Sequence, residues 1–345
     1  ISKMYHKEKS IHMKSSASSL YNSLSVLRIA PCCLNCFTVV HANVVNMVSA
    51  SWDGLNYSHR QLQSKEGNVA TSFSLIMQAA VCVLPSRDLL VLTSQKGIQM
   101  YESDGSIMAY WHALDTPETP TAKVVFARGI AAVREKYICV GVSSGSVLVF
   151  DVPSKGSNII LSEVLEEHKE AITDMASECS GNLECIADLV SADDSGLLCV
   201  WKSGEDFHLL NKIPGFDTCC SSVNLWNGTV IAGYGTGQIR LYEGVTGILH
   251  AEVNAQARWI YSLDFAPFTG LEREELCLIS AAEDSWVRVW HVSLTPETNS
   301  VEIEHMYNEC VTDTQICGAK FFDGDGYAFA VTSYDLSEII RYTQA

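Results

Sequence analysis

The chain has 345 residues, of which 47% are hydrophobic and 18% charged, a composition that supports a large buried core and excludes a disordered protein. It carries 23 lysines and arginines against 40 aspartates and glutamates, giving a formal net charge of −17. This charge argues against a nucleic-acid ligand, because the phosphate backbone would be repelled. No apolar run approaches the length of a membrane-spanning helix, so we expect no transmembrane segment.

The N-terminal region predicts one isolated strand. Residues 1–3 precede Met4, and we interpret them as an addition ahead of an initiator methionine, with no apolar signal core behind it. Residues 10–14 (SIHMK) alternate between polar and apolar side chains, as a strand does. A small polar linker at 15–19 separates this strand from the first repeat.

One pattern recurs seven times from there to the C-terminus. An apolar strand leads into a tight polar turn, and an alternating strand then closes on a large aromatic residue, as in SAAEDSWVRVW at 280–290 and SADDSGLLCVW at 191–201. The closing aromatics are Tyr57, Tyr101, Phe150, Trp201, Tyr242, Trp290 and Tyr342. A repeat of this length predicts an all-β, seven-bladed β-propeller with four antiparallel strands in each blade.

The predicted ring forms a single domain over residues 4–345. Exposed loops are expected at 115–121 (DTPETPT), at the acidic segment 271–275 and after Thr295. The last repeat has only three strands and ends at Tyr342, while 10–14 has no blade of its own. We therefore predict that 10–14 pairs antiparallel with 338–342, completing the last blade and closing the ring.

The repeats resemble WD40 repeats, most clearly in EHKEAITDM at 167–175 and in the two copies that close on tryptophan. The resemblance implies a hydrogen-bonded tetrad of His, Ser or Thr, Asp and Trp in a blade. In the fourth blade it assigns His168, Ser191, Asp194 and Trp201. In the sixth blade it assigns Gln256, Ser280, Asp284 and Trp290, with Gln in the histidine position. The other blades lack a full tetrad, so the blade count depends on the aromatic spacing.

The same resemblance implies a non-catalytic scaffold or adaptor for proteins or peptides in intracellular signalling. The net charge of −17 favours partners with basic patches. WD40 propellers bind partners on the face that carries the loops into each inner strand and the loops between second and third strands. On that face we place Arg258, Trp259, Asp193, Tyr234, Glu283, Tyr334 and Trp52. Trp, Tyr and Arg are favoured at binding hot spots. Packing of Trp259 against a neighbouring blade is an equally good interpretation.

An alternative function is a metal-dependent hydrolase that uses carboxylates in the central channel. Only Asp174 and Asp264 stand near the start of an inner strand, and no nucleophile elbow, phosphate loop or His-Glu-x-x-His motif is present. We therefore predict no enzyme activity, no catalytic residue and no cofactor.

Thirteen scattered cysteines, several within predicted core strands, indicate reduced thiols and a cytoplasmic location. Cys32, Cys33 and Cys36 resemble part of a zinc site. Cys219 and Cys220 make a poor second pair, because neighbouring residues of a strand point to opposite faces. We predict no metal site.

Overall fold

The computed structural model describes residues 4–64, 74–115, 119, 123–182, 184–268, 274–295, 298 and 300–344. Residues 1–3, most of the predicted loop at 115–121 and most of the acidic loop at 271–275 lie outside the described residues. Within these ranges the one helix is the short 3-10 turn η1 (Ala30–Cys32), and no helix is long and apolar enough to cross a membrane.

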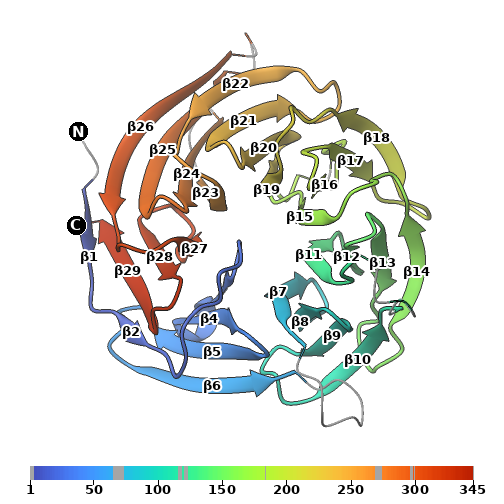
Figure 1. Cartoon of the computed structure of the whole chain (residues 1–345), viewed down its shortest axis with the longest axis horizontal. Helices are drawn as coiled ribbons and strands as arrows, with labels where there is room; N and C mark the ends of the chain where they lie inside the picture. Colours follow the sequence, from blue (N-terminus) through green and yellow to red (C-terminus); the bar gives the residue numbers. More distant parts are fainter. Residues whose placement is uncertain are drawn as a thin grey trace.

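Seven antiparallel sheets stand as blades around a common axis (Figure 1). In each blade the first strand lies nearest the axis. Blades one to three are β3 (Leu24–Ile29), β4 (Leu34–His41), β5 (Val44–Ser51) and β6 (Tyr57–Gln63); β7 (Ile76–Leu84), β8 (Arg87–Ser94), β9 (Gly97–Glu102) and β10 (Met108–Ala113); and β11 (Ala127–Val133), β12 (Tyr137–Val142), β13 (Val147–Asp151) and β14 (Ile160–Leu165).

The next three blades have the same order. They are β15 (Ile172–Ser177), β16 (Leu189–Asp193), β17 (Leu198–Lys202) and β18 (His208–Ile213); β19 (Cys220–Trp226), β20 (Thr229–Tyr234), β21 (Gln238–Glu243) and β22 (Leu249–Asn254); and β23 (Ile260–Pro267), β24 (Glu274–Ala282), β25 (Trp286–Thr295) and β26 (Ser300–Cys310). Blade seven is β27 (Ile316–Phe321), β28 (Ala328–Ser333) and β29 (Glu338–Gln344), completed by β1 (Tyr5–Lys7) and β2 (Ile11–His12). The predicted fold class is confirmed.

The closing aromatics lie on the third strand of blades two to seven, where they are buried between neighbouring sheets. Tyr101, Phe150 and Tyr342 are each at most 1% exposed. The first blade is different, because its third strand β5 contains no aromatic residue, and Tyr57 begins the outer strand β6 with 36% of its surface exposed. Tyr57 was therefore wrongly assigned as a closing aromatic, although the blade itself is present.

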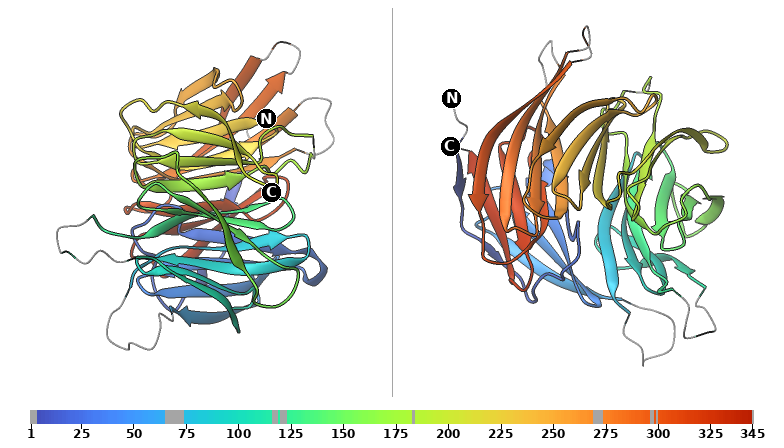
Figure 2. Two further views of the ribbon diagram at one scale, coloured as in Figure 1. Left: turned by 90° about the vertical axis from the view of Figure 1, so that its right-hand side faces the viewer. Right: turned by 45° about the horizontal axis from the view of Figure 1, so that its top comes forward.

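The N-terminus closes the ring, as predicted, and both chain ends lie at the same rim (Figures 1 and 2). In the predicted segment, Ile11 pairs with Ile339 and is fully buried. A second strand, β1, was not predicted. It places Tyr5 opposite Gln344, and the Tyr5 ring packs edge-on against Phe329 at 4.9 Å between centroids. Ring closure thus uses two short strands along the whole length of β29.

A chain that starts at Lys14 should be less stable than the full chain and should self-associate. It loses the buried side chains of Tyr5 and Ile11, each contributing about 1.5–3 kcal/mol, and it exposes the edge of β29. Melting temperature and sedimentation measure both effects. A synthetic peptide of residues 4–13 should restore stability in trans, whereas a scrambled peptide should not. A shortened chain that stays monomeric and melts with the full chain would contradict ring closure by the N-terminus.

Candidate functional site

The propeller has two faces, each built from two sets of loops. The upper face carries the loops that lead into each innermost strand and those between second and third strands. The lower face carries the loops between first and second strands and between third and fourth strands. The two faces are seen edge-on in the left view of Figure 2.

In the fourth blade a buried polar network connects the loop before β15 to β16 and β17. His168 contacts Ser191 Oγ through Nε2 at 2.7 Å, and Trp201 Nε1 donates to the same hydroxyl oxygen at 3.0 Å. The ionised carboxylate of Asp193 can only accept, so Nδ1 carries a proton, and Nε2 of the neutral ring accepts from the Ser191 hydroxyl. The Nδ1 proton is donated to Asp193 Oδ2 at 2.8 Å.

The acid of this tetrad is Asp193, and the assignment of Asp194 was wrong. Asp193 ends β16 two residues after Ser191, so both side chains point to the same side of the strand, whereas that of Asp194 points away. Asp193 is 1% exposed and also accepts hydrogen bonds from the backbone of Ser195 and Leu197. It therefore cannot belong to the partner-binding surface where we had placed it.

The charge state of Asp193 reflects this environment. Burial alone would raise the pKa of its carboxyl, but the hydrogen bonds from His168 and Ser195 outweigh burial and hold the pKa below its usual value. The exposed neighbour Asp194 donates its backbone N–H to the carbonyl of Ala171, and its carboxylate contacts Cys219, outside this network.

The sixth blade has a modified network. Gln256 Nε2 donates to Ser280 Oγ at 2.9 Å, and Trp290 Nε1 donates to the same oxygen at 3.1 Å. Asp284 does not reach Gln256. Instead Arg288 lies between them and donates to Gln256 Oε1 and to Asp284 Oδ2. The fourth blade has its acid, Asp193, two residues after the serine, whereas the sixth blade has Ala282 at that position. Our sequence analysis did not anticipate that Arg288 would take part instead.

The remaining candidates for the binding surface divide between the two faces and the core. Tyr234 is fully buried, with its ring 4.5 Å from Phe216, so its placement on the surface was wrong. Trp52 follows β5 in the loop to β6 and therefore lies on the lower face, under the guanidinium of Arg28. Our placement of Trp52 on the upper face was therefore also wrong. The upper-face loop of this blade joins β4 to β5, and Trp52 lies in the next loop along the chain.

The other four candidates do lie in upper-face loops. Arg258 is exposed, Tyr334 is 45% exposed, and Trp259 and Glu283 are partly exposed. Glu283 donates its backbone N–H to the carbonyl of Trp259 at 3.0 Å, so the loops of this blade are joined at that point.

Trp259 belongs to an aromatic group that is centred on Tyr21 and that the sequence did not reveal in full. Its ring stacks on Tyr21 at 6.3 Å with an interplanar angle of 17°, and Tyr21 meets Tyr261 edge-on at 5.5 Å. Arg128, which is 7% exposed, places its guanidinium 4.2 Å from the centre of the Tyr21 ring. We call Tyr21, Arg258, Trp259, Tyr261 and Tyr334 the upper cluster.

Tyr21 reaches this position because the chain must cross the upper face from β2 at the rim to β3 at the axis. Ala17 forms a bridge with Tyr334 on the way. Asn22 then donates its backbone N–H to Tyr261 at 2.9 Å and its side-chain amide to the carbonyl of Ser221 at 3.3 Å. The crossing segment thus bonds to blades five and six, beyond its own blade, at the upper end of the axis.

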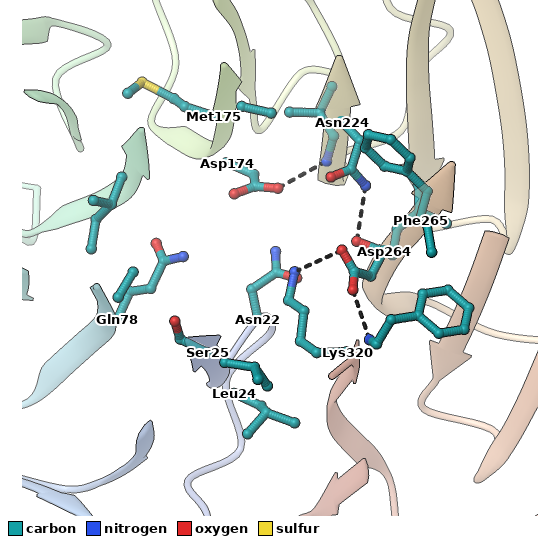
Figure 3. A pocket seen from close by; sticks show the side chains of 18 of the residues that line it. Asn22, Leu24, Ser25, Gln78, Asp174, Met175, Asn224, Asp264, Phe265 and Lys320 are labelled. Carbon is teal, nitrogen blue, oxygen red and sulfur yellow. Dashed lines mark hydrogen bonds and ion pairs between the residues drawn. The ribbon is translucent and has the colours of Figure 1, made fainter. Parts of the chain in front are cut away.

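Below Asn22 is a cavity of about 410 Å³ along the axis, shown in Figure 3. It contains Asp174 and Asp264, the carboxylates considered for an enzyme. Asp174 Oδ2 accepts the backbone N–H of Val223, and Asp264 Oδ2 accepts that of Phe321, both at 2.8 Å. Each carboxylate therefore links its blade to the next blade, and Lys320 lies 3.9 Å from Asp264.

The same kind of link recurs elsewhere around the axis. Gln78 Oε1 accepts the N–H of Gly129 at 2.9 Å, and Ser262 Oγ accepts the N–H of Ala319 at 3.0 Å. Gln78, Asp174 and Ser262 all follow an irregularity in the pairing of the first strand with the second. This shared position assigns a structural role to Asp174.

Among the described residues no group of three or more His, Cys, Asp or Glu side chains is arranged to hold a metal ion. Cys32 and Cys33 lie in the exposed turn between β3 and β4, on the lower face. Cys219 and Cys220 lie buried at the start of β19.

The fold is that of a WD40-type β-propeller. It has seven four-stranded blades, its N-terminus closes the ring, and in two blades a Ser–Trp pair binds a His or Gln from the preceding loop. The family model for WDR54 matches residues 4–345. The chain is 52% identical to mouse WD repeat-containing protein 54 over 98% of this chain and 99% of the mouse protein. It is 52% identical to the human protein of that name over 99% of each chain. The chain therefore belongs to the WDR54 family.

Among solved structures, a chain in the crystal structure of the mitotic checkpoint complex superimposes with a TM-score of 0.72. The alignment covers 99% of this chain and 94% of that chain at 14% sequence identity. This similarity shows a shared fold.

Substituting the two neighbouring aspartates should give opposite results. Asp193→Ala leaves the buried Nδ1–H of His168 without its acceptor and should lower the free energy of unfolding by about 1–3 kcal/mol. Asp194→Ala, the matched control on the surface, should change it by less than about 0.5 kcal/mol. Denaturant unfolding of both variants measures the difference, and equal losses would contradict the assignment of Asp193.

Trp201→Phe should destabilise the fold by about 1–3 kcal/mol, because it removes the indole donor to Ser191 and leaves a small cavity. His168→Ala should destabilise it comparably. Thermal melting of the two variants measures this, and unchanged melting in both would refute the network.

Asp174 should give the fold a specific pH dependence. Burial raises its pKa from 3.8 to about 6 in the folded chain, so the folded state binds more protons than the unfolded state between these values. Stability should therefore fall as the pH rises from about 4 to about 6. Asp174→Asn keeps an acceptor for Val223 and should remove roughly 2–3 kcal/mol of this loss. Parallel stability–pH profiles for the two proteins would refute this.

Proposed function

We propose that this propeller is a non-catalytic scaffold or adaptor that binds proteins or peptides across the upper cluster. The WDR54 family and the WD-repeat fold support protein interaction in general. The observation that carries the specific proposal is the environment of Trp259. Its partly exposed ring stacks on Tyr21 and stands next to the exposed side chain of Arg258, so aromatic and charged surface meet at one place.

Such a site suits recognition of an extended peptide. A partner side chain can pack on the exposed part of the Trp259 ring, while exposed Arg258 and Tyr334 offer a charge and a second aromatic surface. Because Asn22 occupies the upper end of the axis, the ligand lies across the cluster and does not insert a side chain into the axial cavity.

The hydrolase alternative receives less support from the axial cavity. Asp174 and Asp264 each use one carboxylate oxygen to connect blades, and Asp264 also faces Lys320. A stoichiometric divalent ion in metal analysis of the purified protein would nevertheless favour it over the scaffold.

The cytoplasm is the proposed location. All thirteen cysteines are unpaired, and Cys32, Cys33, Cys179 and Cys310 are exposed. Exposed unpaired thiols are compatible with a reducing compartment. A role in intracellular signalling follows from the resemblance to WD40 adaptors and is part of the same proposal.

Proximity labelling with a biotin ligase fused to the chain tests the proposal. Arg258→Glu and Trp259→Ala should each lower the labelling of a common set of proteins by roughly tenfold or more, since hot-spot residues contribute over about 1.4 kcal/mol. Trp52→Ala is the matched control on the lower face and should leave that set unchanged. Melting curves would verify that all three variants fold. One identical set of labelled proteins for all variants would overturn the upper-cluster proposal.

A further inference from the structure

The lower face of blades four to six contains a groove of about 460 Å³. Its walls are the loop between β15 and β16, the loop between β19 and β20, the loop that follows β21, and the adjoining ends of β24, β25 and β26. Three loops and the strand ends of a third blade thus converge on one concave surface. This groove lies on the face opposite the upper cluster.

The floor of the groove is apolar and open to solvent. Ile186 is 60% exposed and Val245 is 37% exposed, and the partly buried side chains of Leu294 and Val301 continue the same surface. Ile248, next to the groove in the loop before β22, is 57% exposed. Exposed apolar side chains gathered in a concave surface mark an interaction site, because a partner that covers them removes apolar surface from water, which is favourable.

The rim of the groove is acidic. Glu184, Glu243 and Glu274 line it, and none of them forms an ion pair within the described part of the chain. Glu274 accepts a hydrogen bond from the side-chain amide of Asn227, and Glu243 accepts one from the hydroxyl of Thr246. These neutral donors position both carboxylates without neutralising them.

Positive charge near the groove is already engaged. His250 is the one basic side chain among the described lining residues. Behind the groove, Lys202 reaches the carbonyl of Cys185 at 2.9 Å, but Asp188 holds its ammonium at 3.4 Å. Asp188 also binds Arg134. The three rim carboxylates therefore remain available to an incoming cation.

We infer that this groove docks a partner peptide that buries an apolar side chain on Ile186 and Val245 and places lysine or arginine side chains against the acidic rim. Apolar contact supplies affinity, and the rim supplies charge complementarity and a faster, salt-dependent association. The inference does not depend on the upper cluster. With it, the propeller has two binding surfaces on opposite faces, as a scaffold for two partners requires.

Selection of random twelve-residue peptides displayed on phage, followed by fluorescence titration of one selected synthetic peptide, tests the groove. The folded full chain is the target. Selected peptides should combine lysine or arginine with large apolar residues. Ile186→Ser should weaken binding of the selected peptide by roughly tenfold, and Glu184→Gln should weaken it by about threefold.

Two matched controls lie elsewhere on the surface. Ile160, on β14, is 53% exposed, and Glu166 is exposed and forms no ion pair within the described part of the chain. Ile160→Ser and Glu166→Gln should leave peptide affinity within about twofold of the unchanged protein. Raising the salt concentration should slow association through the rim charges.

Several outcomes would overturn the inference. Selected peptides that are acidic, or that bind Ile186→Ser and Ile160→Ser equally well, would place binding elsewhere. Failure to select any binding peptide would also contradict it. Sedimentation of the free protein as a dimer that Ile186→Ser converts to a monomer would show that a second copy of the chain, and not a basic peptide, covers the groove.

Discussion

The structure depends on closing a ring from the two ends of one chain. β29 would otherwise present an unpaired edge, and an open ring of seven blades would leave its first and last blades without neighbours. Pairing of β1 and β2 with β29 removes this edge. Joining such distant segments costs loop-closure entropy, but that cost rises only logarithmically with loop length. Buried Tyr5 and Ile11 offset it.

Closure also shapes the candidate site. A chain that begins at the rim of blade seven must cross the upper face to reach β3 at the axis, and this crossing brings Tyr21 to Trp259 and Asn22 to the axis. The polar groups of the interior are largely committed to structure, as Asp174 and Asp193 illustrate. The two proposed binding surfaces, the aromatic upper cluster and the acidic lower groove, accordingly lie on the two faces.

The closing aromatics predicted blades two to seven because their spacing is set by packing on the third strand, whereas blade one was located through Tyr57 on its outer strand. The sequence analysis selected Asp194 in place of Asp193 because it could not fix the last residue of β16. A shift of one residue at the strand end reverses the side to which a side chain points. Tyr21 and Arg128 could not be found, since they meet only through the path of the crossing segment. The lower groove likewise joins irregular loops whose conformations no short pattern specifies.

Hydrogen exchange followed by mass spectrometry tests ring closure most directly, because it reports the opening of individual strands in the intact protein. Closure predicts that peptides covering β29 exchange slowly and that residues 5–12 and 338–344 open together, with the same free energy. Rapid exchange in residues 5–12 while β29 stays protected would contradict the account. It would show that the N-terminal strands do not hold the last blade.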